Sequence, residues 1–92
     1  IRSIRDRRVQ QILDGVRPKR FSPDLLRATE KRLTALELAE HVTDLAVPPS
    51  MRLEKLAGDR EGSWSIRINR QWRVCFRWQK DGAYDVEIVD YH

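Results

Sequence analysis

Apolar and polar side chains alternate over three consecutive segments between residues 63 and 92, and this pattern constrains the fold more than any other feature. A period of two places neighbouring side chains on opposite faces of a pleated strand. The predicted core face holds Trp64, Ile66, Ile68, Trp72, Val74, Phe76, Trp78, Tyr84, Val86 and Ile88. The predicted opposite face holds Ser65, Arg67, Asn69, Arg73, Cys75, Arg77, Gln79, Asp85, Glu87 and Val89. The sequence therefore predicts an antiparallel sheet with one hydrophobic face and one arginine-rich face.

Turn signals separate these three strands. Asn69-Arg70-Gln71 predicts a tight hairpin, and Asp81-Gly82 predicts a second one because both residue types tolerate positive φ. Upstream, residues 52–56 indicate a further short strand, which precedes a polar loop at 58–62. Residues 1–5 are ambiguous and are compatible with an edge strand added to the sheet.

Two helices are predicted in the first half of the chain. Asp6 can cap the first, which carries an apolar stripe and ends near Gly15. Ser22-Pro23 has the residue types of an N-cap and a first helical position for the second. The two stripes comprise Val9, Ile12, Leu13 and Val16, then Leu25, Leu26, Thr29, Leu33 and Leu36. We expect an α+β fold with two N-terminal helices, lying antiparallel, packed on one face of a small antiparallel β-sheet.

The length of 92 residues predicts a single domain over residues 1–92 with one core. Eighteen Lys and Arg against fourteen Asp and Glu give a formal net charge of +4, which favours polyanionic partners. Cys75 is the only cysteine, so an internal disulfide is excluded and a reducing, cytoplasmic setting is favoured. No apolar run reaches the length of a membrane span.

The arginines of the polar sheet face are the first candidate site. Arg67 and Arg73 lie on strands that share the 69–71 hairpin, and Arg77 lies further along the same face. A guanidinium fork suits phosphate and can stabilise the charge of a phosphoryl-transfer transition state. The alternative is that these arginines are solvated or pair with Asp85 and Glu87 across the sheet, and spacing alone favours this second interpretation.

The terminal Asp90-Tyr91-His92 segment is the second candidate site. Histidine is the side chain best suited to proton transfer near neutral pH, and Asp or Tyr can orient it or share its proton. The alternative is a frayed polar terminus. His41 and His92 are the only histidines and do not occur at metal-ligand spacing, so neither a metal site nor a cofactor is predicted.

The blocks GDREG, WSIRIN, QWR and DYH, in this order, resemble HigB-type toxins of the RelE superfamily, which belong to type II toxin–antitoxin systems. The likeness covers nearly the whole chain, including the opening residues 1–6. It implies a microbial RNase-like α+β fold and ribosome-dependent cleavage of mRNA by attack of a ribose 2′-OH on the adjacent phosphate, without a metal. It also implies a HigA-like helix-turn-helix antitoxin as partner, operator DNA as an indirect partner through that antitoxin, and a cytoplasmic location.

The same resemblance assigns roles to residues. Arg73 would stabilise the developing phosphorane, and Asp90, Tyr91 and His92 match the C-terminal active-site segment, with His92 as the proton-transfer residue. The substrate-binding residues would be Arg67, Lys55, Arg60 and Glu54.

Two positions depart from the family pattern. Glu54 and Ala57 stand where some relatives carry His and Lys. Glu54 is therefore either the general base or an ion-pair partner of a neighbouring arginine. Two competing functions remain: a non-catalytic module of the same fold that binds an antitoxin-like protein or RNA, and a standalone RNase that acts on free RNA.

Overall fold

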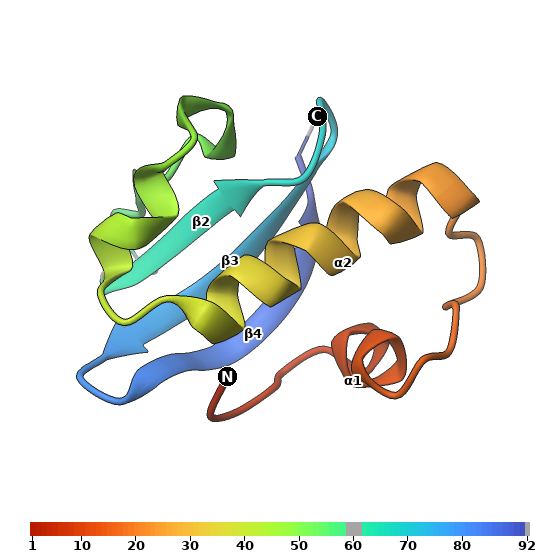
Figure 1. Cartoon of the computed structure of the whole chain (residues 1–92), viewed down its shortest axis with the longest axis horizontal. Coiled ribbons are helices and arrows are strands. Elements are labelled where there is room, and N and C mark those ends of the chain that lie inside the picture. The colour runs from red at the N-terminus through yellow and green to blue at the C-terminus, as the bar shows by residue number, and fades with distance from the viewer. Residues whose placement is uncertain (59–61, 92) are drawn as a thin grey trace.

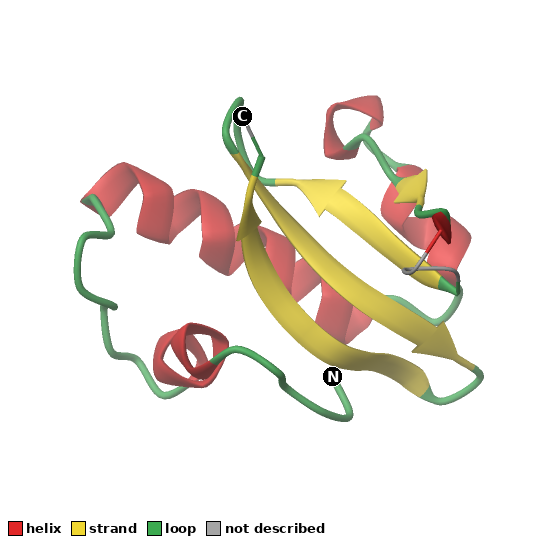
Figure 2. Cartoon of the chain, turned by 180° about the vertical axis from the view of Figure 1, so that it is seen from behind, coloured by secondary structure: helices red, strands yellow, loops and turns green. Residues whose placement is uncertain are grey.

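A four-stranded antiparallel sheet in the order β1-β2-β3-β4 forms the framework of the computed structural model, which describes residues 1–58 and 62–91. The strands are β1 Glu54–Lys55, β2 Ser63–Arg67, β3 Trp72–Gln79 and β4 Gly82–Asp90. The helices are α1 Arg7–Leu13 and α2 Pro23–Leu38, with the 3₁₀ turns η1 Val42–Ala46 and η2 Pro49–Met51. Helix α2 lies across one sheet face and α1 packs beside it against β4, while these helices leave the other face open (Figures 1 and 2). The predicted α+β fold class is confirmed.

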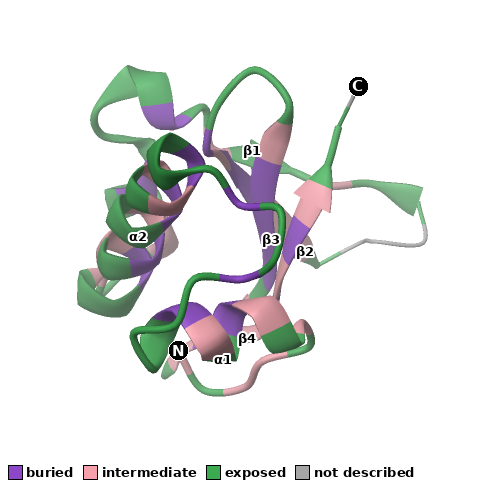
Figure 3. Cartoon of the chain, turned by 90° about the vertical axis from the view of Figure 1, so that its right-hand side faces the viewer, coloured by how far each residue is buried: buried purple, intermediate pink, exposed green. Residues whose placement is uncertain are grey.

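The predicted helix starts are also confirmed. The Asp6 side chain accepts a hydrogen bond from the backbone N–H of Arg8 (2.9 Å), and Ser22 Oγ accepts one from Leu25 N–H (3.1 Å). Each satisfies a backbone donor that would otherwise be unpaired at a helix start. Helix α2 buries Leu25, Thr29, Leu33 and Leu36 against the sheet (Figure 3). No helix of residues 1–58 and 62–91 combines the length and apolar character needed to cross a membrane.

Two expectations about α1 are wrong. Helix α1 has only seven residues, so Val16 lies beyond its end and is 51% exposed, and Leu13 is 44% exposed. Only Val9 and Ile12 of the predicted stripe reach the core, because so short a helix presents few side chains to one side. The axes of α1 and α2 also cross instead of running antiparallel, since α1 is seen nearly end-on where α2 is seen lengthwise (Figure 1).

The alternation predicted for β2 and β3 is confirmed. Ile66, Val74 and Ile88 are partners across the sheet, and all three are buried in the core beneath the helices. Trp64, Trp72 and Trp78 are partly buried and pack against that core. The hairpin between these strands falls at 68–71, where the Asn69 carboxamide accepts hydrogen bonds from the backbone of Gln71 (2.9 Å) and Trp72 (2.8 Å).

The alternation predicted for β4 is interrupted at Asp85. This residue has φ +54°, and the register between β3 and β4 shifts between Cys75 and Arg77. Such an extra residue in one strand reverses the side-chain alternation beyond it. Ala83 is therefore fully buried in place of Tyr84, whose hydroxyl donates to Asp81 Oδ2 (2.6 Å). The β3–β4 turn is Lys80-Asp81, one residue earlier than predicted, and Gly82 is the first residue of β4.

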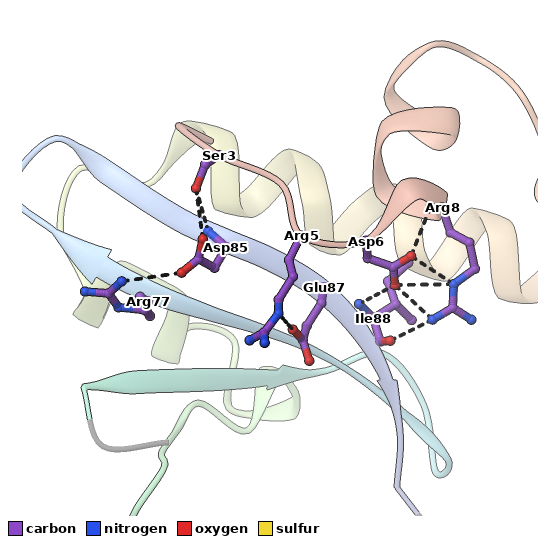
Figure 4. Close-up of polar contacts among 8 residues, drawn as sticks. All are labelled: Ser3, Arg5, Asp6, Arg8, Arg77, Asp85, Glu87 and Ile88. Atoms are coloured by element: carbon purple, nitrogen blue, oxygen red, sulfur yellow. Dashed lines mark hydrogen bonds and ion pairs between the residues drawn. The ribbon is translucent and has the colours of Figure 1, made fainter. Parts of the chain in front are cut away.

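The N-terminal segment joins the free edge of β4, as the edge-strand interpretation anticipated. Ile4 forms a parallel bridge with Val86, and Val86 N–H donates to the Ser3 carbonyl (3.2 Å). Ion pairs and hydrogen bonds reinforce this pairing (Figure 4). Asp6 Oδ2 accepts from Ile88 N–H (3.0 Å), so the residue that caps α1 also attaches the helix to the sheet.

Candidate active site

The open sheet face has a shallow hollow at the end where the 68–71 hairpin lies. Its volume is about 370 Å³, and it is lined by Arg52, Glu54, Arg67, Asn69, Arg70, Arg73 and Tyr91. Among the described residues that line it, four arginines against one glutamate make it strongly cationic. We refer to this site as the arginine hollow.

Arg73 is the most constrained side chain of the arginine hollow. It is only 9% exposed, its Nε donates to Ser65 Oγ (2.8 Å) and its Nη2 donates to the Arg52 carbonyl (2.6 Å). Its Cζ lies 5.9 Å from the centroid of the Tyr91 ring. Two of the three guanidinium nitrogens are therefore held in place.

The third nitrogen, Nη1, has no hydrogen-bond partner in the described part of the chain. No buried side-chain nitrogen or oxygen among the described residues lacks a partner, so Nη1 keeps some contact with solvent. This nitrogen is therefore a donor of Arg73 that remains available to a ligand.

Strand register explains how Arg73 comes to be buried on a face without helices. Arg67 and Arg73 are direct partners, and Ser65 lies one side-chain repeat along β2 on the same face. Ser65 is fully buried, because the Arg73 guanidinium bonds to it. Arg52 has a left-handed backbone (φ +48°) directly after η2, and its carbonyl points toward Arg73.

The hairpin holds the C-terminal segment beside the arginine hollow. Tyr91 N–H donates to the Gln71 carbonyl (2.6 Å), and Gln71 Nε2 donates to Asp90 Oδ2 (3.1 Å). Tyr91 lines the hollow, and its hydroxyl lies 3.9 Å from Cys75 Sγ. Asp90 is the partner of Trp72 across the sheet, so its side chain leaves on the opposite face from Arg73.

The structure gathers four of the predicted site residues, Arg73, Arg67, Tyr91 and Glu54, in the arginine hollow. Glu54 Oε2 lies 3.9 Å from Arg73 Nη2, which matches the ion-pair interpretation of Glu54.

The other predicted site residues lie elsewhere. Asp90 is adjacent to the hollow without lining it, and Lys55 is the partner of Trp64 with its Nζ 5.7 Å from that ring, on the opposite face. Arg60 and His92 lie outside the described residues. Arg77 pairs with Asp85 (3.4 Å), so the cross-strand ion-pair interpretation is correct for this arginine (Figure 4).

Three residues that line the hollow were not predicted as site residues from the sequence. Arg70 could have been found, because it sits in the hairpin between the paired Arg67 and Arg73. Asn69 was assigned to the sheet face, whereas it both shapes the hairpin and lines the hollow. Arg52 carries no local signal, since only the left-handed turn after η2 brings it here.

This arrangement suits a phosphate ligand. An oriented guanidinium nitrogen and three more arginines can bind phosphodiester oxygens, while Tyr91 supplies a hydroxyl and an aromatic ring. Among residues 1–58 and 62–91, no group of three or more His, Cys, Asp or Glu side chains could hold a metal ion. The fold and site thus define a small α+β domain suited to binding a nucleic-acid backbone.

Comparison with known proteins identifies the family. A family model described as the RelE-like toxin of the type II toxin–antitoxin system HigB matches residues 2–92, so the chain belongs to the HigB-like toxins. The Vibrio cholerae protein named Toxin HigB-1 is 33% identical over 89 residues, covering 96% of this chain and 93% of that protein. The Proteus vulgaris protein named Endoribonuclease HigB is 38% identical over 61 residues, which cover 66% of this chain and 65% of that protein.

Membership of this family confirms the resemblance found in the sequence. It also implies that the toxin has an antitoxin partner, since the family consists of toxins of type II toxin–antitoxin systems.

Proposed function

We propose that this toxin is an endoribonuclease that cleaves mRNA on the translating ribosome. The observation that carries the proposal is the guanidinium of Arg73, which is buried, is held at two nitrogens and lines a cationic hollow. The name of the Proteus vulgaris relative, Endoribonuclease HigB, supports the same reaction class.

The proposed reaction is attack of a ribose 2′-OH on the adjacent phosphate. A base removes the 2′-OH proton, the P–O5′ bond breaks, and an acid protonates the leaving 5′ oxygen to give a cyclic phosphate and a 5′-OH. Negative charge builds on the non-bridging oxygens of the transition state, and a fixed donor aimed at this charge lowers the barrier. Arg73 Nη1 is that donor in our proposal.

The proton-transfer groups are Asp90, Tyr91 and His92 in this proposal, with His92 as the principal residue. Tyr91 lines the hollow, and Gln71 hydrogen-bonds both Tyr91 and Asp90. Glu54 faces the same hollow and has two possible roles, as general base or as ion-pair partner of Arg73. Glu54→Gln separates them, because an amide keeps a hydrogen-bond acceptor for Arg73 but cannot take a proton.

Substrate binding is assigned to the arginines around Arg73. Arg67, Arg52 and Arg70 surround the hollow, where they can contact the phosphates next to the scissile one. The hollow is open and shallow, so it holds RNA on one side only. Alignment of the mRNA by the ribosome would supply the remaining positioning, and positioning of this kind can account for much of a rate enhancement.

The proposed partners follow from the family. The antitoxin would be a HigA-like helix-turn-helix protein, and the complex would reach operator DNA through that antitoxin. The toxin would act in the cytoplasm, where bacterial mRNA is translated.

The test is cleavage in a translating bacterial extract. Purified toxin is added to the extract and, separately, to the same mRNA without ribosomes, and the RNA ends are mapped. We expect new 5′-OH ends only in the translating sample, and loss of cleavage when the mRNA carries a 2′-deoxyribose at the mapped site. Cleavage of free mRNA at the same rate would contradict ribosome dependence, and cleavage of the deoxy substrate would contradict the mechanism.

A non-catalytic binding module is the second candidate function. The pairing of Glu54 with Arg73 favours it, because this contact partly neutralises the guanidinium that the reaction would use. His92→Ala distinguishes the two functions: an enzyme loses both cleavage and growth arrest, whereas a binding module keeps its effect on growth.

A further inference from the structure

A second concave surface lies between α1 and α2, on the helix side of the sheet. It has a volume of about 360 Å³ and is lined by Ile12, Leu13, Glu30, Leu33, Thr34, Glu37 and Leu38. We call it the helix groove. We infer that the antitoxin docks here, through a segment that presents apolar side chains flanked by Lys or Arg. The inference rests on membership of the toxin–antitoxin family and is independent of the proposed RNA cleavage.

The apolar part of the helix groove is unusually exposed. Leu38 at the end of α2 is 76% exposed, and Leu13 at the end of α1 is 44% exposed. Single exposed apolar residues are common, but two leucines that share a groove with the buried Ile12 and Leu33 form a contiguous apolar surface. Apolar side chains of a partner can fill such a surface and remove it from water.

The charge of the groove limits the chemistry of the partner. Among the described residues, Glu30 and Glu37 are the charged ones that line it, in a protein whose net charge is +4. Glu37 accepts a hydrogen bond from the amino group of Ile1, whereas Glu30 has no ion-pair partner in the described part of the chain. A partner with basic residues beside its apolar anchor would complement this rim, while an acidic segment would be repelled.

The two concave surfaces differ in character. The arginine hollow is cationic and lies on the open face, whereas the helix groove is apolar with an acidic rim and involves α1 and α2. A polyanion fits the first surface and a protein segment fits the second. Variants in the two surfaces should therefore separate antitoxin binding from toxic activity.

The test is titration calorimetry of the full-length toxin with the purified antitoxin of the same module. Leu38→Glu and Leu13→Glu place a carboxylate at the apolar anchor points, and each should weaken binding by about tenfold or more, as loss of a buried interface anchor does. Val47→Glu is the matched control, because Val47 is an exposed apolar residue like Leu38 (73% and 76% exposed) but lies outside the helix groove. It should change the affinity by less than about twofold.

The charge of the rim is tested separately. Glu30→Lys should also weaken antitoxin binding, with most of the effect lost at high salt, because a rim charge acts through screened electrostatics. Circular dichroism of each variant checks that the fold is kept. We expect no loss of structure, because the side chains of Leu13, Glu30, Leu38 and Val47 are exposed.

Two results would overturn the inference. One is wild-type affinity in Leu38→Glu and Leu13→Glu, together with loss of binding in Arg67→Ala, which would place the antitoxin at the arginine hollow. The other is a free toxin that is dimeric in light scattering and becomes monomeric with Leu38→Glu, which would assign the groove to self-association. Neither measurement depends on RNA cleavage, so failure of the proposed enzymatic function would leave this test intact.

Discussion

At the residue scale, the orientation of Arg73 is the feature that most needs a physical explanation. A surface arginine samples many rotamers, whereas Arg73 is held by Ser65 Oγ, the Arg52 carbonyl and the ring of Tyr91. Ordering a long side chain in advance removes an entropy cost that substrate binding would otherwise have to meet. Ser65 is therefore a positioning residue, since it acts on the reaction only through Arg73.

Ser65→Ala tests this role. The change removes the acceptor for Arg73 Nε and leaves that donor without its partner in a buried setting, so we expect a loss of about 1–3 kcal/mol in the free energy of unfolding. In the cleavage assay kcat should fall while KM changes little, because the guanidinium stays present but is less well oriented.

The control for Ser65→Ala is Ser63→Ala, on the same strand and the same sheet face but opposite Arg77. It should leave both kinetic parameters near the wild-type values. An unchanged kcat in Ser65→Ala would show that the hydrogen bond does not position Arg73 for the reaction.

At the element scale, the helix starts and the β2–β3 hairpin follow from local sequence, while the bulge of β4 does not. Asp6 and Ser22 are residue types that cap helix starts, and Pro23 is a residue type typical of a first helical position. The alternation around Ile66 and Val74 is unbroken. Asp85 lies in a segment whose residue types alternate regularly, so nothing in the local sequence predicts its left-handed backbone. That conformation accompanies pairing with β3 and with the N-terminal segment. Non-local contacts of this kind cannot be predicted from a short sequence pattern.

The bulge makes Asp85→Val a counterintuitive prediction. Valine is a good strand former, but a β-branched residue at φ +54° is strained, and the ion pair with Arg77 is also lost. We expect a loss of about 1–3 kcal/mol in urea unfolding. Asp85→Asn should cost less, because asparagine tolerates the left-handed region. Equal stability of the two variants would mean that the bulge imposes no strain.

Asp6 couples α1 to β4 in a pH-dependent way. Burial alone would raise the pKa of Asp6, but hydrogen bonds from the Arg8 side chain and the backbone of Ile88 and Arg8 outweigh it, so this pKa lies below its usual value of 3.8. A carboxyl group with a lower pKa in the folded state stabilises the fold above that usual value, and the contribution is lost as the pH falls through the folded-state pKa.

Asp6→Asn should therefore cost about 1.5–3 kcal/mol in the free energy of unfolding at pH 7, the range for hydrogen bonds to a charged group. The difference from the wild type should shrink toward zero once the pH falls below 3.8. Denaturant unfolding at several pH values measures both quantities. A difference independent of pH would mean that the charge of Asp6 does not contribute.

At the scale of the whole molecule, the two sheet faces have different roles: one forms the core with the helices, and the other carries the arginine hollow. The helix face was predictable because hydrophobic periodicity reports burial directly, and its core residues Ile66, Val74 and Phe76 were correctly identified. The open face was predictable only in part. Alternation placed Arg67 and Arg73 on it, but this polar face was not expected to bury Arg73 and Ser65. Arginine, serine and backbone carbonyls bury one another here, and no hydrophobic pattern records such burial.

The most direct test of the central claim compares Arg73→Ala with Arg77→Ala in the translating extract. Both arginines lie on β3 and face the same side of the sheet, but Arg73 is in the arginine hollow whereas Arg77 is exposed and paired with Asp85. If Arg73 stabilises the transition state, its removal should slow mRNA cleavage by about 100-fold or more, the effect of losing one preorganised donor. Arg77→Ala should keep cleavage within about threefold of the wild type, as expected for a surface ion pair. Equal losses in the two variants, or full activity in Arg73→Ala, would contradict the assignment of the arginine hollow as the place where RNA is cut.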